Sequence, residues 1–392
     1  MRTPLKKLCS IAARVLLLAT LIWVLFAHRH QIETNAVDGK RDSLAYWAAG
    51  KLQLHRQNPY SPTAVLALQR SQGFQALKPR MFRPLPWSLW MTLPLGLLDG
   101  YWAWIAWLAI SLAALMLSLR HCWRLYGGQN GSPSSAFVVA TYLFAPVVGC
   151  FVWAQMSTVL LLGVVLFLEF QEERPLWAGA ALTITFAKPH IFIALLPVVA
   201  VWLIFRKKWS LFAGAVAAFA LECLLALSFD PSVFSHYRQM LQTEALQSEF
   251  IPALSGMVRV FFFREHFWVQ FAPAVLGVVW GLWYYWKNAG HWNWTEHGPA
   301  LLIASLLTTP YDKFQDETVL LPAILQGVAW LSARKLRLRS QLAILVFAIF
   351  DLLLLLVLNA RMDVSTGIYF WSSLVWFSWY WYASRFSQQE DC

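Results

Sequence analysis

The stretch from residue 38 to residue 60 reads DGKRDSLAYWAAGKLQLHRQNPY and organises the interpretation of the whole chain. It is polar and follows the first hydrophobic segment, yet it carries an apolar stripe at the spacing of one helix face, formed by Leu44, Trp47, Ala48 and Leu52. Asp42 stands where a short acceptor side chain caps the free amides of a helix start. We therefore predict an amphipathic helix on a membrane surface. Its first carboxylate is either an ordinary cap or a group that acts on one substrate from lipid and another from water.

The composition is that of a polytopic membrane protein. Of 392 residues, 59% are hydrophobic and only 13% are charged, whereas soluble domains carry roughly 25% charged residues. No stretch is long enough and polar enough for a separate soluble domain, so we predict one integral-membrane domain over residues 1–392. The net charge of +11 suits anionic lipid headgroups or phosphate-bearing substrates, and no nucleic-acid motif is present.

The cysteines and the N-terminus narrow the chemistry and the targeting. Five cysteines are scattered in no metal-ligand spacing and no disulfide pattern, so we expect neither a metal nor another cofactor. Basic residues at positions 2, 6, 7 and 14 precede or open an apolar run over 15–27. Because no convincing small-residue cleavage site follows that run, a retained signal anchor is favoured over a cleaved signal peptide.

Apolar segments near 20 residues indicate an all-α bundle of about 12 transmembrane helices. The candidate spans are 11–27, 101–119, 136–153, 157–171, 175–189, 190–205, 209–229, 267–286, 298–310, 318–333, 340–360 and 364–383. Several of these segments are shorter than a bilayer requires, and Lys188-Pro189 interrupts the region over 175–205.

Short basic connections set the orientation in the membrane. They place both termini on the cytoplasmic side, together with the connections at 120–124, 206–208 and 334–339. Residues 28–100 then form a non-cytoplasmic loop with juxtamembrane helices, whose basic part suits a phosphate group or lipid headgroups equally. Segment 84–98 contains three prolines and does not cross in this scheme, so we predict a re-entrant or interfacial helix there. The alternative is one extra span and an inverted topology downstream.

Ionisable groups at membrane depth are expensive and therefore point to function. Lys188 precedes Pro189, which disfavours helix at the lysine, so its cation lies at a broken helix end, a usual place for anion sites in membrane proteins. A lysine that extends its charge to the membrane surface fits the sequence equally well. Asp312, Asp316 and Glu317 cluster between two spans, either in a functional site or in a solvated turn.

Six motifs occur in one order along the chain. They are RDSLAYWAAGKLQLHRQNPYSP, MFRPLPWSLWMTLPLGLL, WAQMSTVLLLGVVLF, RPLWAGAALTITFAKPHIFIALLPVV, IPALSGMVRVFF and LLTTPYDKFQDETVLLPAIL. Over about residues 38–325 this order resembles the bacterial polytopic glycosyltransferases of family 87, which have the GT-C fold. Three departures concern the sugar and the acceptor more than the fold. They are Ala154-Gln155-Met156-Ser157 where many relatives have Gly-Gln-x-Asn, Arg83-Pro84-Leu85-Pro86 in place of a doubled proline, and a Tyr-Asp pattern before Gln315-Asp316 where mannosyltransferase relatives often carry His.

The resemblance implies transfer of a sugar, typically mannose, from a polyprenyl-phosphate carrier to a hydroxyl of a glycan or glycolipid, at the non-cytoplasmic face of the bacterial inner membrane. The family's first-loop aspartate corresponds to Asp42, which lies four residues before Tyr46 and would be the general base of an inverting displacement. Cations would stabilise the leaving phosphate, for which the candidates are Lys188, Arg83 and Arg80. The remaining substrate-binding candidates are Tyr46, Gln155, His190, Tyr311, Asp312 and Asp316.

Two rival functions fit part of the sequence. A lipid or solute transporter or flippase would also have broken helices and charges near the midplane, but transporters usually show internal repeats and this chain has none. A non-catalytic membrane scaffold would not need Asp42 and Lys188. We therefore expect an enzyme whose partners are a lipid-linked sugar, an acceptor and membrane lipids.

Overall fold

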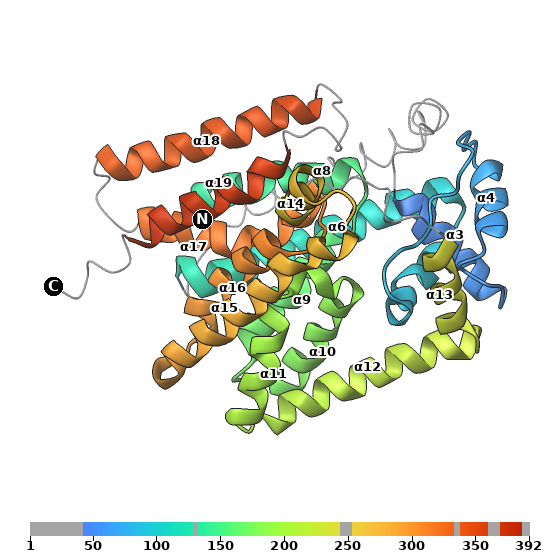
Figure 1. Cartoon of the computed structure of the whole chain (residues 1–392), viewed down its shortest axis with the longest axis horizontal. Coiled ribbons are helices and arrows are strands. Elements are labelled where there is room, and N and C mark those ends of the chain that lie inside the picture. The colour runs from blue at the N-terminus through green and yellow to red at the C-terminus, as the bar shows by residue number, and fades with distance from the viewer. Residues whose placement is uncertain (1–41, 129–131, 244–252, 333–337, 360–368, 386–392) are drawn as a thin grey trace, which may run out of the picture.

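The computed structural model describes residues 42–128, 132–243, 253–332, 338–359 and 369–385, and every regular element in these ranges is a helix (Figure 1). The longer helices are α3 (Ser43–Leu54), α4 (Pro62–Ser71), α6 (Gly100–Cys122), α7 (Ser135–Tyr142), α8 (Ala145–Val152), α9 (Ser157–Phe170), α10 (Pro175–Thr183), α11 (Leu195–Phe205), α12 (Trp209–Phe229), α13 (Val233–Thr243), α14 (Leu254–Phe262), α15 (Ala272–Asn288), α16 (Trp294–Thr308), α17 (Leu321–Ser332), α18 (Leu338–Asn359) and α19 (Phe370–Ser384). Short helices connect them: η1 (Pro86–Thr92), α5 (Leu93–Gly96), η2 (Trp123–Gly127), η3 (Ile184–Ala187), η4 (Pro189–Phe192), η6 (Phe267–Phe271), η7 (Ala289–His291) and η8 (Phe314–Leu320).

The two ends of the bundle carry different elements and contacts. At one end, Arg124 pairs with Glu169 at 3.1 Å, Lys208 pairs with Glu172, and Arg206 donates to the carbonyl of Ala289. We call this the basic end; it joins the last turns of α6, α9, α11 and α15 to the start of α12. The opposite end, which we call the site end, carries α3, α4 and α13, on the right of Figure 1. Helices α6 and α12 run between the two ends, because α6 packs against α3 and α12 ends just before α13.

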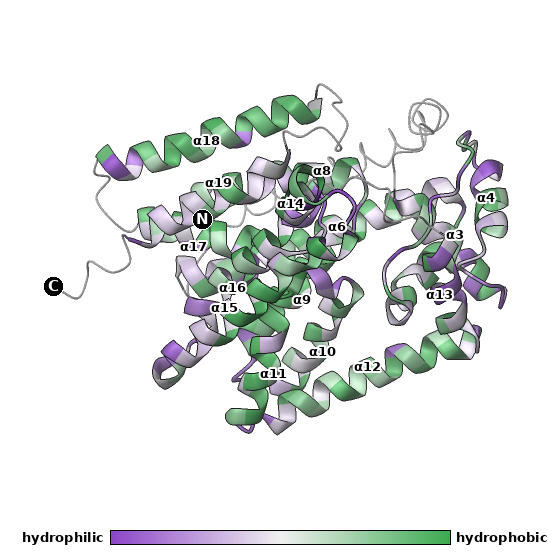
Figure 2. Ribbon diagram, in the orientation of Figure 1, coloured by the Kyte–Doolittle hydropathy of each residue, from purple (hydrophilic) through white to green (hydrophobic). Residues whose placement is uncertain are grey.

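Four of the described helices are long and apolar enough to cross a membrane, namely α6 with η2, α12, α15 with its flanking η6 and η7, and α18. A fifth span exists if α7 and α8, which meet at a 45° bend, are counted together. Figure 2 shows hydrophobic residues along α12 and α18, and hydrophilic residues around α4 and at the end of α15. The large exposed hydrophobic residues of α18 are leucines, valines and isoleucines, and those of α12 are leucines, Val216, Trp209 and Phe212, as expected for helices that face lipid.

The predicted positions of the helices agree closely with the structure. The structure does not give the predicted number of membrane spans. Segment 209–229 is α12 to the residue, and 101–119 lies inside α6. The segments 136–153 and 175–205 are each divided into shorter helices. The first predicted span, 11–27, lies outside the described residues. The count of about 12 spans therefore stays a prediction.

The break at Lys188-Pro189 has a local cause. Proline disfavours the helical conformation of the residue before it, and Lys188 adopts φ −137° and ψ 68° between η3 and η4. Helix α10 therefore ends through a 3-10 turn, and the chain resumes as α11 only after His190. This break brings the Lys188 side chain into the protein interior rather than along a helix surface.

Helix α3 corrects the prediction of an amphipathic helix on a membrane surface. It is buried on nearly all sides, with Ala45, Tyr46 and Ala49 buried as well as the predicted Trp47, Ala48 and Leu52. Small residues on its second face make this possible, because a Cβ added to Gly50 would lie 2.1 Å from the carbonyl oxygen of Thr92. The apolar stripe was therefore real, but the opposite face is covered too, chiefly by α5.

Segment 84–98 forms two short helices, η1 of 7 residues and α5 of 4 residues. At about 2.0 Å per residue in a 3-10 helix and 1.5 Å in an α-helix, they are too short to cross a hydrocarbon core of about 30 Å. The segment packs against α3 and α12. Which side of the membrane it faces stays a prediction.

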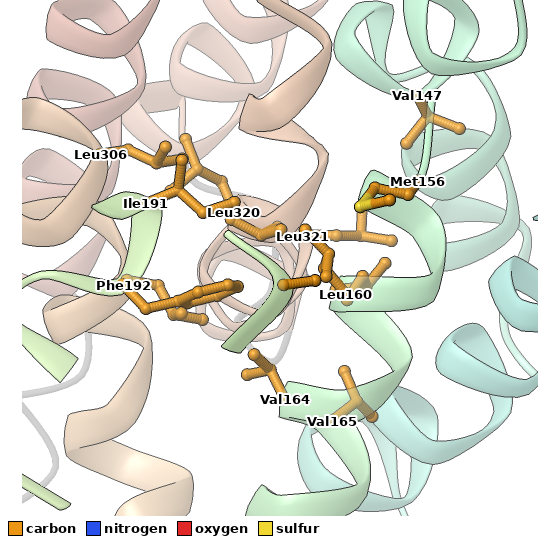
Figure 3. Close-up of a cluster of buried hydrophobic side chains, with 14 of the residues drawn as sticks. Val147, Met156, Leu160, Val164, Val165, Ile191, Phe192, Leu306, Leu320 and Leu321 are labelled. Carbon is orange, nitrogen blue, oxygen red and sulfur yellow. The ribbon is translucent and has the colours of Figure 1, made fainter. Parts of the chain in front are cut away.

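A buried apolar cluster lies beneath the break and joins the elements around it (Figure 3). Ile191 and Phe192 of η4 meet Leu160 and Val164 of α9, and Leu320 at the end of η8; each of these side chains is at most 1% exposed. Because close-packed interiors resist displacement, the cluster fixes the relative positions of η4, η8 and the first turns of α9.

We predict that residue 97 and residue 173 lie on opposite sides of the membrane. Leu97 is 73% exposed and Glu173 is exposed near the basic end, so Leu97→Cys and Glu173→Cys should both react with an impermeant maleimide, but from different sides. The test uses sealed cells and inverted vesicles, with Cys9, Cys223 and Cys392 replaced by Ser. Labelling of both new cysteines from one side would contradict the topology.

Candidate active site

Asp42 stands at the predicted position before α3 but does not act as a cap. Its carbonyl accepts the first helical hydrogen bond, from Ala45 N at 2.9 Å, whereas its side chain makes no capping bond. The carboxylate turns instead toward Gln155, whose Nε2 donates to Oδ2, and toward Arg80, whose Nη1 lies 3.2 Å from Oδ1. The capping interpretation of this side chain is therefore wrong, because its acceptors face residues far away in the sequence.

A strained turn between α8 and α9 receives the start of α3. Ala154 adopts φ +51°, which is uncommon for a residue with a Cβ. The turn presents the carbonyl of Trp153 to the amide of Asp42 at 2.9 Å. It also turns the Gln155 side chain toward Asp42, so the backbone contact and the side-chain contact reinforce each other.

The backbone of Arg80 is held by α4, and its side chain extends to Asp42. The side chain of Gln69 on α4 accepts from Arg80 N at 2.9 Å and donates to Arg80 O at 2.7 Å. The Arg80 side chain is 31% exposed and the Asp42 side chain is 26% exposed. The pair lies at the accessible edge of the site, where a substrate can reach both groups.

Lys188 occupies the interior of the same network. Its Nζ donates to Gln155 Oε1 at 3.2 Å and to Asp316 Oδ1 at 2.7 Å. The side chains of Lys188 and Asp316 are only 13% and 4% exposed. The alternative of a lysine that extends its charge to the membrane surface is therefore wrong, because this ammonium points inward to a buried carboxylate.

Asp316 is the most fully paired acid of the network. Beyond Lys188 it accepts from Ser157 Oγ at 2.7 Å and from the backbone amide of Lys313 at 3.3 Å. Burial by itself raises the pKa of Asp316, but the charge of Lys188 and the hydrogen bonds from Lys188 and Ser157 outweigh it, so the pKa lies below its ordinary value. Asp316 is therefore an anion that is held in place.

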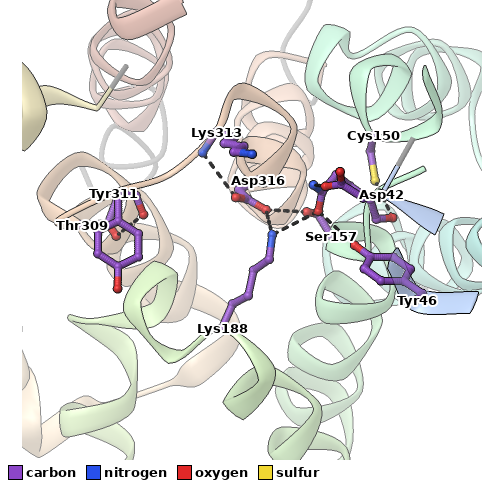
Figure 4. A network of polar contacts seen from close by, with 10 residues as sticks. Asp42, Tyr46, Cys150, Ser157, Lys188, Thr309, Tyr311, Lys313 and Asp316 are labelled. Carbon is purple, nitrogen blue, oxygen red and sulfur yellow. Dashed lines mark hydrogen bonds and ion pairs between the residues drawn. The ribbon is translucent and has the colours of Figure 1, made fainter. Parts of the chain in front are cut away.

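A second flank lies beyond the Lys188–Asp316 pair, as Figure 4 shows for Tyr311. The ring centroids of His190 and Tyr311 are 4.7 Å apart. Asp312 is 6% exposed, and burial, followed by the charge of Asp316, raises its pKa well above the ordinary value. The rings of His190 and Tyr311 offer an apolar surface that suits a sugar ring.

This second flank is held by helices from another part of the chain. Ser255 Oγ on α14 contacts the carbonyls of Thr309 and Pro310 at 2.7 and 2.8 Å. Gln270 Nε2 on η6 donates to Pro310 O at 2.6 Å. The loop that carries Tyr311 is therefore fixed by α14 and η6.

The structure thus unites most of the predicted site. Asp42, Tyr46, Arg80, Gln155, Lys188 and Asp316 form one continuous hydrogen-bonded network, and His190, Tyr311 and Asp312 adjoin it. Arg83 is exposed and contacts α13 through its carbonyl, which accepts from Tyr237 OH at 3.1 Å.

Three further acids have partners outside this network. Glu317 faces α19, where Trp376 Nε1 donates to it at 2.9 Å. Glu222 accepts from Thr183 Oγ1 at 2.9 Å, and Asp351 accepts from the amide of Ala145 at 2.7 Å. The solvated-turn interpretation of 312–317 is wrong, since all three acids there are at most 6% exposed. Within the described ranges no group of three or more His, Cys, Asp or Glu is arranged to hold a metal ion; the absence of a metal requirement stays a prediction.

Comparison with known families gives one match. The model of glycosyltransferase family 87 matches residues 85–310, which is more than half of the chain. The chain belongs to glycosyltransferase family 87. No curated protein and no solved structure matches it. The predicted resemblance is confirmed, and the family supports the expectation of a membrane glycosyltransferase.

The region that matches the family model contains only part of the hydrogen-bonded network of this glycosyltransferase. Gln155, Lys188 and His190 lie inside the matched region, whereas Asp42 and Asp316 lie outside it. The functional role of the latter two therefore rests on their contacts in this chain.

Sequence reasoning missed Ser157. It stands in the motif position where many relatives have Asn, and its hydroxyl donates to Asp316. Serine and asparagine side chains can both donate to a carboxylate. The serine in place of asparagine was therefore the available signal for a polar role at this position.

We predict that loss of Asp316 destabilises this glycosyltransferase through Lys188. Asp316→Leu leaves a buried ammonium without its carboxylate, which costs about 3–5 kcal/mol. Adding Lys188→Met should recover much of that loss, since apolar replacement of a whole buried pair is often nearly neutral. Thermal unfolding in detergent, followed by tryptophan fluorescence, measures both. Glu173→Leu, at an exposed carboxylate, is the control, and equal unfolding temperatures for wild type and Asp316→Leu would contradict the prediction.

Proposed function

We propose that this family 87 glycosyltransferase transfers a sugar from a polyprenyl-phosphate carrier to an acceptor hydroxyl, with Asp42 as the general base. The observation that supports the proposal is the state of the Asp42 carboxylate. This carboxylate makes no capping hydrogen bond and is partly exposed to solvent. It lies between Arg80 and the Gln155–Lys188 pair.

The reaction is a single displacement at the anomeric carbon. The acceptor hydroxyl gives its proton to Asp42 as its oxygen forms the bond to the anomeric carbon. The bond from that carbon to the phosphate oxygen breaks, and the polyprenyl phosphate leaves with the electron pair. One base with in-line attack inverts the configuration. Cations next to the leaving group stabilise the charge that develops on it.

Asp42 is a better base than the acids around it. The Asp316 side chain is 4% exposed and already accepts from Lys188, Ser157 and the Lys313 amide, so a hydroxyl would have to displace a paired donor. Asp312 is only 6% exposed, so an acceptor hydroxyl reaches it less readily than it reaches Asp42. Asp42 is the most accessible carboxylate of the network.

Arg80, Arg83 and Lys188 are the proposed ligands of the donor phosphate. Arg80 is the most accessible cation of the network and suits a phosphate because guanidinium forms paired hydrogen bonds with it. Lys188 has three N–H donors, two of which are used on Gln155 and Asp316, so one remains for the phosphate. Tyr46 and the His190–Tyr311–Asp312 flank complete the proposed substrate contacts.

The finer features of the proposal come from the family resemblance and from the charge distribution. The sugar is proposed to be mannose and the acceptor a glycan or glycolipid. The site end is assigned to the non-cytoplasmic face of a bacterial inner membrane, because the opposite end gathers the short basic connections. No metal enters this scheme, in which the three cations are the proposed ligands of the phosphate.

We predict that Asp42→Asn is folded, binds donor and transfers sugar about 10²–10⁴-fold more slowly, which is the usual contribution of general-base catalysis. Asparagine keeps the size of the side chain but loses the negative charge and with it the proton acceptor. The assay uses radiolabelled polyprenyl-phosphate sugars with membranes that contain the protein. Asp99→Asn, at the residue that caps α6, is a matched control and should stay active. Transfer at the wild-type rate by Asp42→Asn would show that another group is the base.

We predict that Arg80→Gln lowers kcat/KM for the lipid-linked donor by about 10- to 100-fold, because a hydrogen bond to a charged group contributes about 1.5–3 kcal/mol. Arg80→Lys should retain part of the activity, since a cation remains. Arg70→Gln is the control, because Arg70 is an exposed arginine on α4. If Arg80→Gln and Arg70→Gln behave alike in donor titrations, Arg80 does not bind the phosphate.

A further inference from the structure

Gln155 joins the two charged halves of the site. Its Nε2 donates to Asp42 Oδ2, while its Oε1 accepts from Lys188 Nζ at 3.2 Å and from Tyr46 OH at 3.3 Å. The side chain is 3% exposed. A single amide therefore contacts both the proposed base and the interior cation.

The neighbours of Gln155 permit one orientation of its amide. An ionised carboxylate only accepts hydrogen bonds and an ammonium only donates them. A flipped amide would place its oxygen against Asp42 and its NH₂ group against Lys188, so both contacts would become repulsive. The charges on either side thus force the amide to direct its donor at Asp42.

The backbone of this turn is held as firmly as the side chain. The carbonyl of Ala154 accepts from Trp107 Nε1 at 2.9 Å. The amide of Gln155 donates to Cys150 O at 2.9 Å, and Cys150 Sγ donates to Gln155 O at 3.3 Å. A residue with a positive φ persists only where its surroundings over-determine it, and these contacts supply that constraint around Ala154.

We propose that Gln155 is a positioning residue for Asp42 rather than a ligand of the substrate. Its amide donates to Oδ2 and fixes the direction in which that carboxylate points. Lys188, through Oε1, keeps the amide in this orientation. The catalytic consequence rests on the proposed function of Asp42, whereas the effect on the carboxylate itself does not.

Two isosteric variants separate the two contacts of the amide. Gln155→Met removes both. Gln155→Glu keeps an acceptor for Lys188 but turns a second carboxylate toward Asp42. Each change favours the protonated form of Asp42, because a hydrogen bond or an opposite charge stabilises the anion and a like charge destabilises it. The acidic limb of the pH–rate profile should therefore move to higher pH, by about one unit for the lost hydrogen bond and by more in Gln155→Glu.

The kinetic test separates positioning from substrate binding. With the lipid-linked sugar donor, a positioning role lowers kcat by about tenfold or more and leaves the KM of the donor within about twofold. A substrate ligand would instead raise KM. Gln171→Met and Gln171→Glu are the matched controls, because Gln171 ends the same helix, α9, at the basic end. They should leave both constants and the pH profile unchanged.

A second measurement needs no sugar donor. A hydrophobic carbodiimide reacts with protonated carboxyl groups, and mass spectrometry of the Asp42 peptide gives the extent of labelling against pH in detergent. The labelling curve should move to higher pH in both Gln155 variants and stay in place in the Gln171 variants. This arm tests the inference even if the wild-type protein transfers no sugar from polyprenyl phosphate, which would overturn the proposed function alone. Unchanged labelling curves in both Gln155 variants would overturn the inference, as would a raised KM with unchanged kcat.

Discussion

The contact on which the site depends is the buried ion pair of Lys188 and Asp316. Two charges with side chains 13% and 4% exposed persist only if each is satisfied by close partners. Lys188 reaches this position because Pro189 breaks the helix, and Asp316 reaches it because η8 begins there. The pair therefore connects the break between η3 and η4 with η8. The apolar cluster beneath the pair fixes the relative positions of η4 and η8.

Exposure increases outward from this pair in an order that suits the proposed chemistry. The Asp316 side chain is 4% exposed, Lys188 13%, Asp42 26% and Arg80 31%. The anion that stays paired is innermost, and the groups that would meet the hydroxyl and the phosphate are outermost. Electrostatic interactions strengthen as water is excluded, so the deep pair can influence the base through Gln155, in addition to the proposed contact of Lys188 with the donor phosphate.

Sequence patterns predicted what depends on local order along the chain. The apolar run of α12, the break at Lys188-Pro189 and the position of Asp42 before a helix all follow from hydropathy, proline chemistry and helix spacing. The direction of a side chain depends on what the fold brings beside it. Asp42 looks like a cap because its partners, Arg80 and Gln155, are distant in the sequence. The covered second face of α3 was missed for the same reason, since it depends on the close approach of Gly50 to α5.

The proposed base and the interior cation belong to different parts of the protein. Asp42 lies on α3, ahead of the region that matches family 87, whereas Lys188 lies within it. Helix α3 docks through the bond from Asp42 N to Trp153 O and through Trp47 Nε1, which donates to Leu98 O at 2.9 Å. Gln155 forms a side-chain link across this junction. Since the base reaches its partners only when α3 is seated, the free energy of docking α3 is also the free energy that assembles the site. The small residues of α3 therefore serve the chemistry as well as the packing.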